Sequence, residues 1–376
     1  MTIATSIRGG FAVREATPCD NGALVALAAA CPMRGAVSLC VDRAPDFFAL
    51  NRLEGDSWRV GVAVTGDGDV VGCVAVATRT AFVTGVPAQV AYVSDLKVHP
   101  AYRNGMVADA LSAYASGASR ELGGHDVPIS LTILAGNRAM ERRVDGPRGL
   151  PILRRVATIR AHAVSLLWRR GIPGSSMTVA PGTERDLEEM AALWQEVAPT
   201  RQLASCYDAD SLSEWIHAAP ALDIGGYLLA RRRDGRLAGF LGMWDQAEFK
   251  QLRVTGYSAR LATFRAGFNT VAPLIGAAAL PAVGAPLRHL TAVHVCVARD
   301  EPQVLRALLL HAYAAARGRG YSFFTIGLDL RDPLTLALRG LLAQPTDIHA
   351  YVTAPSGRYR GPDFGESPFH HEIALA

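Results

Sequence analysis

The residues with the clearest chemical potential lie in a segment that begins at Val90 and reads VAYVSDLKVHPAYRNGMVADAL. A β-type run ends at the His-Pro pair, and a helical pattern begins directly after a short loop that carries Arg103, Asn104 and Gly105. Such a loop directs backbone N–H groups and a helix N-terminus to one place, which is how a protein can hold a pyrophosphate without a metal. The segment therefore predicts an anion site.

The same segment resembles the acyl-CoA-binding signature of the GNAT N-acyltransferase superfamily, in which a strand runs into V-x-P-x-Y-R and then a glycine-containing loop. The resemblance implies that the strand lines the pantetheine arm of the donor and that the loop binds its pyrophosphate. The implied donor-binding residues are Leu96, Lys97, Val98, Arg103, Asn104, Gly105, Met106, Val107 and Ala108. Asn137 is implied to place its amide near the same arm. The implied donor is acetyl-CoA or another acyl-CoA, with no metal.

Two positions depart from the family pattern. The family has glycine at the position of Met106, because the backbone must approach the phosphate oxygens closely and a side chain obstructs that approach. Gly105 lies one place early and could substitute for it in a rebuilt loop. Where the family often has a tyrosine that protonates the leaving thiolate, this chain has Val144. The donor site can therefore be functional, reshaped or lost.

The reaction that the resemblance implies is direct attack of an amine on a thioester. Holding the two reactants together supplies most of the acceleration, and a general base adds a smaller factor. Asp95, on the donor strand, is the nearest acid that matches the base of the family. The backbone N–H of Val98 is the implied donor to the oxyanion.

One order of elements occurs twice along the chain. Each copy begins with a short strand and a helix that an acid opens, Asp20 in the first and Asp186 in the second. Hairpins with Asp-Gly turns follow, and then a strand, a helix, a further strand and a further helix. We expect an α+β fold of two tandem GNAT-like domains, each a mixed, mostly antiparallel sheet flanked by helices. Residues 1–172 form the candidate catalytic domain, and residues 173–376 a degenerate one with an insertion at about 250–288.

The second copy lacks a phosphate loop, so it is expected to shape the acceptor pocket or to support the first domain. Asp245 and Lys250 lie in a polar run at a predicted strand end, where they are expected to face the cleft between domains and bind the acceptor. The run SPFHHE near the C-terminus could bind a metal or enter the cleft. A mobile terminus is the favoured interpretation, because adjacent histidines point apart in an extended chain.

Composition limits the class of protein. Half of the 376 residues are hydrophobic and 19% are charged, so two domains with large cores are expected. The six cysteines have no metal-ligand spacing, which favours a reducing compartment. The N-terminus has no apolar core of a signal peptide, and prolines interrupt the most apolar later segment. We expect a cytoplasmic protein without a membrane or DNA partner.

Nine arginines lie between Arg138 and Arg170, where a solvated helix face and a connecting helix are expected. Such residues could clamp the nucleotide end of coenzyme A or engage an RNA backbone. The function that the resemblance implies is transfer of an acyl group, expected to be acetyl, from acyl-CoA to a small-molecule amine. The alternatives are an aminoacyl-tRNA-dependent transferase of the same fold, with tRNA as the donor, and a non-catalytic acyl-CoA-binding module.

Overall fold

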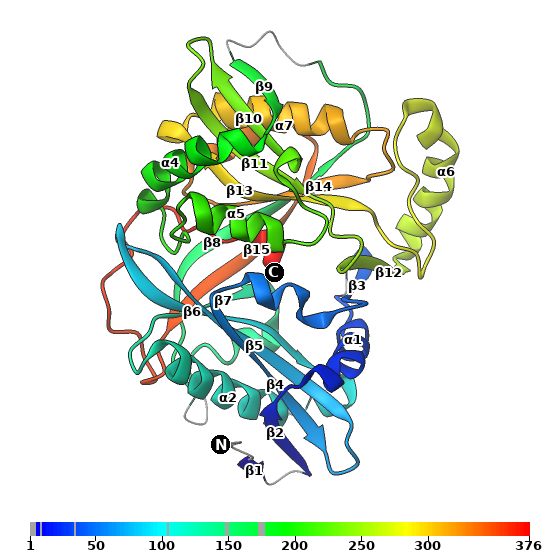
Figure 1. Cartoon of the computed structure of the whole chain (residues 1–376). Coiled ribbons are helices and arrows are strands. Elements are labelled where there is room, and N and C mark those ends of the chain that lie inside the picture. The colour runs from blue at the N-terminus through cyan, green and yellow to red at the C-terminus, as the bar shows by residue number, and fades with distance from the viewer. Residues whose placement is uncertain (1–4, 8–9, 34, 104, 147–149, 172–176) are drawn as a thin grey trace.

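The computed structural model describes all residues except 1–4, 8–9, 34, 104, 147–149 and 172–176. The described strands form a thirteen-stranded sheet and a separate two-stranded sheet. The strand order of the large sheet is β1-β2-β4-β5-β6-β7-β15-β8-β14-β13-β11-β10-β9. One continuous sheet thus runs through both halves of the molecule (Figure 1).

The first half contains β1 (Thr5–Ile7), β2 (Phe11–Glu15), α1 (Asn21–Ala29), β3 (Val37–Asp42), β4 (Ser57–Thr65), β5 (Val70–Val83), β6 (Val86–Val98), α2 (Met106–Gly123), β7 (Ile129–Leu134), α3 (Arg138–Glu141) and β8 (Arg154–Ser165). The second half contains β9 (Met177–Pro181), α4 (Leu187–Val197), α5 (Ala209–Ala218), β10 (Tyr227–Arg232), β11 (Leu237–Trp244), β12 (Gln251–Tyr257), α6 (Ala259–Ile275), β13 (His289–Val297), α7 (Pro302–Ala316), β14 (Phe323–Asp329) and β15 (Ala343–Thr353). Most of these elements lie where the sequence predicts them.

The predicted repeat is visible in the order of elements. In the first half, β2, α1, β4, β5, β6, α2 and β7 occur in this order, with β3 between α1 and β4, and β6 and β7 are parallel. In the second half, β9, α4, β10, β11, β13, α7 and β14 follow in the same way, and β13 and β14 are parallel. The predicted α+β fold of two GNAT-like units is confirmed. The joint expected near 172–174 lies outside the described residues.

The two halves exchange their last strands. β8, from the first half, pairs with β14 of the second, and β15, from the second half, pairs with β7 of the first. β8 and β15 also pair with each other and so close the sheet across its centre. The prediction of a connecting helix between residues 138 and 170 is therefore wrong. After the four-residue α3, this stretch forms a long strand with alternating exposure, VATIRAHAVS.

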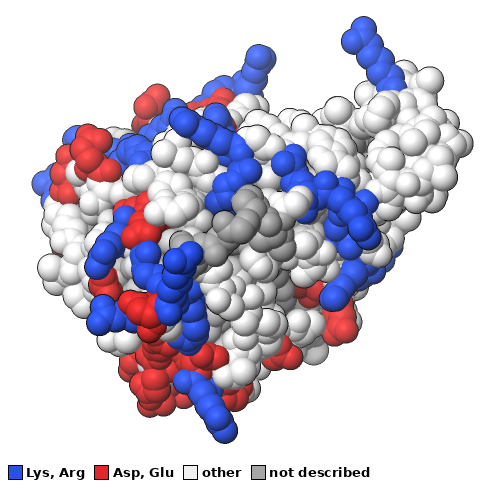
Figure 2. All heavy atoms as spheres, turned by 90° about the horizontal axis from the view of Figure 1, so that it is seen from above, with Lys and Arg blue, Asp and Glu red and all other residues white. Residues whose placement is uncertain are grey.

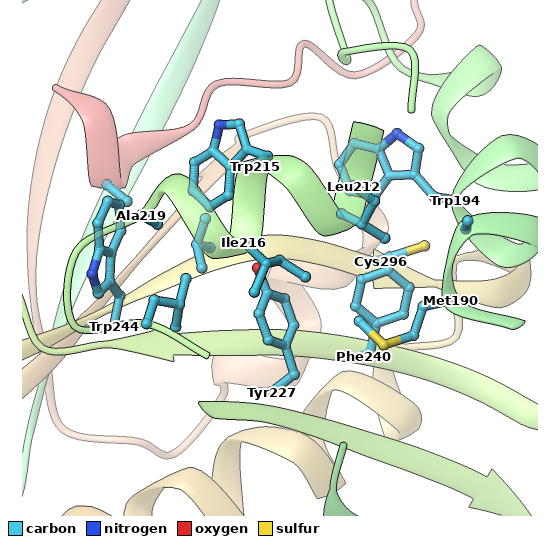
Figure 3. Packing of buried hydrophobic residues seen from close by; sticks show 14 of the residues in the cluster. Met190, Trp194, Leu212, Trp215, Ile216, Ala219, Tyr227, Phe240, Trp244 and Cys296 are labelled. Atoms are coloured by element: carbon cyan, nitrogen blue, oxygen red, sulfur yellow. The ribbon is translucent and has the colours of Figure 1, made fainter. Parts of the chain in front are cut away.

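The helices pack against the sheet through apolar residues that recur at helical spacing on one side of each helix. In α2, Val107, Leu111, Ala115 and Ala118 recur at helical spacing and pack on β4 and β5 with the core of the first half. In the second half, α4 and α5 pack on one face of the sheet and α7 contributes to a separate core cluster. Figure 3 shows Trp194 and Trp215 of these helices beside the side chains of β10 and β11.

The insertion expected at about 250–288 comprises β12, α6 and a return segment. β12 pairs with β3 of the first half to form the two-stranded sheet. α6 projects from the body of the molecule (Figure 1). Within the described residues, no helix is long and apolar enough to cross a membrane.

Candidate acyl-transfer site

The strand β6 separates from its parallel neighbour at the predicted donor segment. Pairing with β7 runs from Ala91↔Ile129 to Val93↔Leu131 and stops there. On its other side, β6 has a bulge at Asp95, where φ is 51° and the pairing with β5 shifts register. The amide of His99 donates to Val71 in β5, and successive amides of a strand point to opposite edges. The Val98 amide therefore points to the open edge.

A cavity of about 590 Å³ lies where the strands diverge. Its walls come from β5, β6, β7, β15, α2, the α3 region and the segment 150–153, and are almost entirely apolar. They include Val93, Leu96, Leu131, Ser112, Ala115, Met140, Arg143 and Leu150. We call it the donor-side cavity. Among the predicted donor residues of β6, Leu96 lines this cavity, whereas the Lys97 side chain pairs with Asp95.

The predicted phosphate loop leads into α2. Gly105 has a φ of 94° and is the N-cap of the helix, so the N-cap residue itself has no side chain that would project toward a ligand. Arg103 donates from Nε to the carbonyl of Val98 (3.0 Å), and Met106 is exposed at the start of the helix. Val107 points into the core rather than to the loop, and Ala108 is half-buried. Asn104 lies outside the described residues.

Arg143 connects the loop to the cavity. It donates from Nη2 to the carbonyl of Gly105 (3.1 Å), forms an ion pair with Asp109 in the first turn of α2, and lines the donor-side cavity. A guanidinium in this position is suited to an anionic group. Asn137 instead caps α3, where its side chain accepts from the amide of Met140 (3.4 Å), and it is exposed.

A buried cluster of charges surrounds Asp95. Arg43, which is 3% exposed, donates to Asp95 Oδ2 (3.1 Å), and Lys97 donates to the other oxygen. Glu54, which is 2% exposed, accepts from Ser94 Oγ (2.9 Å). Asn51 lies between the carboxylates and donates weakly to both. The cluster therefore contains two acids in different environments: Asp95 is paired with cations, whereas Glu54 accepts hydrogen bonds from neutral side chains.

The two acids have opposite pKa shifts. Burial raises the pKa of Glu54 to about 7, and the charge of Asp95 adds to this shift. Burial also acts to raise the pKa of Asp95, but Lys97 and Arg43 outweigh it and hold that pKa well below its usual range. Neighbouring carboxyl groups with diverging pKa values are a common basis for acid–base roles. Asp95 is thus a fixed anion, and Glu54 can gain or lose a proton near neutral pH.

Of the two predicted acceptor residues, Lys250 reaches this cluster. Burial and, to a smaller extent, the charge of Arg43 together lower the pKa of Lys250 to about 7. Its Nζ donates to the carbonyl of Ala374 (3.3 Å). Asp245 accepts instead from Tyr321 (2.7 Å) and Arg288 (3.1 Å) at the end of β11, where it acts as a paired strand-end acid.

A second cavity, of about 470 Å³, lies between the halves. Glu54, Arg79 and Tyr92 line it from the first half, and the second half contributes Trp194, Tyr207, Trp215, His294, His371 and Glu372. We call it the inter-half cavity. Tyr92 lines this cavity while its neighbour Val93 lines the other, and adjacent residues of a strand face opposite sides of a sheet. The two cavities therefore lie on opposite faces of the splayed strand.

The inter-half cavity presents two neutral imidazoles. Burial lowers the pKa of both His294 and His371 to about 4. Each has an Nε2 atom without a hydrogen-bond partner among the described residues. His294 Nδ1 lies 2.8 Å from the hydroxyl of Tyr227, whose pKa burial raises far above its ordinary value. These unpaired nitrogens are available to a polar ligand.

The second half repeats the splayed strand. β13 and β14 pair from His289↔Phe323 to Thr291↔Thr325 and then diverge, and His294 occupies the equivalent bulge with a φ of 50°.

Residues 369–373 of the chain occupy the opening between β13 and β14. Glu372 accepts from the amide of His294 (3.0 Å), and a Cβ on Gly327 of β14 would lie 3.1 Å from Ile373. The amide of Phe369 donates to Asp329 (2.8 Å). The prediction that this segment is mobile is therefore wrong, because hydrogen bonds hold it against the second half.

Because its own residues fill the second opening, we expect each chain to bind one coenzyme A. Isothermal titration with coenzyme A should give a stoichiometry of one. A second equivalent that the variant Gly327→Trp removes would contradict this expectation.

Three of the arginines between residues 138 and 170 have separate partners within the chain. Arg160 pairs with Asp347 (2.6 Å), Arg154 lies over the ring of Tyr359 (5.2 Å), and Arg143 binds Gly105 as described. Figure 2, which views one face of the molecule, shows basic and acidic side chains interspersed over its body. No cluster of three or more histidines, cysteines or acids in the described part of the chain could hold a metal ion.

The arrangement of the two halves is similar to that of known structures. N-myristoyltransferase of Saccharomyces cerevisiae, with bound myristoyl-CoA, matches with a TM-score of 0.64 over 96% of this chain and 81% of that chain, at 12% identity. A GCN5-related N-acetyltransferase from Sphaerobacter thermophilus matches with a TM-score of 0.60 over 95% of this chain and 99% of that chain, at 16% identity. No protein-family model and no curated protein matches the sequence. These similarities confirm the GNAT fold.

Glu54, Arg43 and His294 were not predicted as site residues from the sequence, and His371 was considered only as part of the run SPFHHE. Glu54 follows two short 3-10 helices, Phe47–Ala49 and Asn51–Leu53, in a stretch without strand or helix periodicity. The one available signal was a set of charged residues between two strands, which is common in surface loops. Only packing against β6 shows that these residues are buried.

Proposed function

We propose that the protein is an N-acyltransferase that moves an acyl group from an acyl-CoA thioester to the amine of a small molecule. The donor lies against the open edge of β6 in the donor-side cavity, and the amine enters from the inter-half cavity. The single observation that supports this proposal best is the position of Asp95. The bulge lies where pairing with β7 has just ended and between cavities on opposite faces.

Each step of the reaction has a group in place. Glu54 takes a proton from the entering ammonium, because its pKa of about 7 suits a base at neutral pH. The amine nitrogen then forms a bond to the thioester carbon, and the amide of Val98 stabilises the oxyanion. The carbon–sulfur bond breaks as the tetrahedral intermediate collapses, and the sulfur leaves as a thiolate. The second proton that the nitrogen loses as it becomes an amide passes to this thiolate, so that coenzyme A leaves as the free thiol. We therefore assign the base to Glu54 and a charge-fixing role to Asp95.

The phosphates of the donor are assigned to the first turn of α2, with Arg143 as the cation. Gly105 places no side chain at the N-cap, and the exposed Met106 does not project into the core. Acetyl-CoA is the donor to test first. The aminoacyl-tRNA alternative is less well supported, since Arg143, Arg154 and Arg160 of the stretch 138–170 are already paired within the chain.

Donor binding is tested by thermal unfolding with coenzyme A. A ligand at a hundred times its dissociation constant stabilises the native state by about 2.7 kcal/mol. Ser112 lines the donor-side cavity, whereas Ala113 lies exposed on the same helix. We expect Ser112→Trp to weaken coenzyme A binding by at least about tenfold, since it fills a preformed apolar site, and Ala113→Trp to leave it unchanged. Equal binding by both variants contradicts the proposed donor site.

Transfer is tested by thiol release from acetyl-CoA in the presence of a panel of amines. Release that depends on the amine supports the enzyme. Donor binding without release under any of these amines supports the non-catalytic module instead.

A further inference from the structure

Part of the insertion projects from the body of the molecule (Figure 1), and several of its large apolar side chains are exposed to solvent. We call residues 258–287, which comprise α6 and the segment that returns from it, the α6 lobe. Five of the fifteen large hydrophobic side chains that are exposed in the described structure belong to it. They are Phe264, Val271, Leu274, Ile275 and Val283, and Leu274 is 85% exposed. Such a concentration on one projection marks an interaction surface.

The polar side chains of the lobe are used to fold it. Asn269 donates to the carbonyl of Leu280 (2.9 Å) and accepts from the amide of the same residue (2.8 Å). Arg265 donates to that carbonyl as well (3.1 Å), and Tyr257 donates to the carbonyl of Pro281 (2.7 Å). Segment 284–287 is held against β12 by backbone hydrogen bonds of Val254 and Leu252. The exposed apolar side chains therefore belong to an ordered structure.

The charge of the lobe has one sign. No aspartate or glutamate occurs between Phe249 and Arg299, although acids and bases are nearly balanced over the whole chain. Arg260 is exposed, and neither it nor Arg265 forms an ion pair with a described residue. Figure 2 shows the lobe as a projection without acidic side chains, with basic side chains at its tip and along its base.

We propose that the α6 lobe inserts into the headgroup region of an anionic lipid membrane. A bilayer supplies apolar depth for side chains such as Leu274 and Phe264, and anionic headgroups for the arginines beside them. The lobe is a narrow convex projection, which favours insertion over docking on a flat protein surface. No described helix spans a bilayer, so the contact is peripheral. This proposal departs from the expectation of no membrane partner, which rested on the lack of a spanning segment.

The test is co-sedimentation of the full chain with vesicles. We expect binding to vesicles of phosphatidylcholine mixed with phosphatidylglycerol, and at least about tenfold weaker binding after Leu274→Glu or Phe264→Glu, since each change removes a buried apolar contact. Arg260→Gln should weaken binding about fivefold and reduce its dependence on salt. Val86→Glu is the matched control, because Val86 is 62% exposed on a hairpin far from the lobe in sequence and should leave binding unchanged.

Several outcomes would overturn the proposal. Absence of binding to the anionic vesicles is one, and equal loss with Val86→Glu is another. Concentration-dependent dimerisation in solution that Leu274→Glu abolishes would instead assign the lobe to a second copy of the chain. Circular dichroism and the unfolding midpoint of each variant establish that it is folded. Membrane binding does not depend on acyl transfer, so either proposal can fail alone.

Discussion

Replacement of Glu54 by glutamine is expected to lower kcat about 10²- to 10⁴-fold, the range that a general base contributes. The amide keeps the size of the side chain and can still accept the hydrogen bond from Ser94 Oγ (2.9 Å). It cannot take a proton from the amine. In the unmodified protein, kcat/KM should rise with pH and level off above about 7, where the buried carboxyl is ionised. The variant should lose this dependence. Initial rates of thiol release measured across pH check both expectations.

Glu121→Gln is the matched control for this experiment. Glu121 lies on α2 and is half exposed, in an ion pair with Arg59. Its activity and pH profile should match those of the unmodified protein. If Glu54→Gln retains activity within threefold of that control, Glu54 is not the base.

The variant Asp95→Asn distinguishes the roles of the two carboxyl groups, those of Asp95 and Glu54. The charge of Asp95 raises the pKa of Glu54, so Asp95→Asn should move the rising limb of kcat/KM to lower pH. A base at Asp95 itself would instead produce loss of activity at every pH. Lys250→Met tests whether the lysine, whose pKa is also about 7, contributes to the same limb.

The sequence was most informative where structure is local. The strand, loop and helix of residues 90–123 could be predicted because alternation, a glycine with positive φ and a helical apolar stripe are neighbours in the chain. The repeat was also visible, since both copies use the same short-range signals. The bulge at Asp95 was not, because it is defined by register against β5.

Features that depend on distant packing could not be predicted. β8 carries alternating small and apolar residues amid arginines, and its strand pairing depends on β14 and β15, which come from the other half. The run SPFHHE shows no periodicity, and its fixed position depends on Asp329 and the amide of His294. Glu54 likewise has the sequence context of an ordinary loop acid, and its burial depends on packing against β6. Burial, more than residue type, creates the chemistry of this site.

Loss of Arg43 is expected to be among the most destabilising single changes in the chain. Arg43 is 3% exposed, pairs with Asp95 (3.1 Å) and donates to the carbonyl of Phe47 (2.6 Å). Arg43→Met keeps an apolar stem of similar length but leaves one buried carboxylate short of a cation. Breaking such a pair costs about 3–5 kcal/mol of the free energy of unfolding. Urea unfolding measures this cost.

The control pair is Arg52 with Asp46, in which the side chains are 52% and 36% exposed. Arg52→Met should change the free energy of unfolding by at most about 1 kcal/mol, because water screens an exposed ion pair.

The double variant Arg43→Met, Asp95→Asn should recover part of the stability that Arg43→Met loses, since it removes the charge that was left unpaired. Asp95 has a lowered pKa in the native state, so its pairing stabilises the fold above the ordinary pKa of an aspartate and is lost as pH falls through the lowered value. The deficit of Arg43→Met should therefore shrink in acid. A deficit equal to that of Arg52→Met at neutral pH would mean that the cluster does not depend on this ion pair.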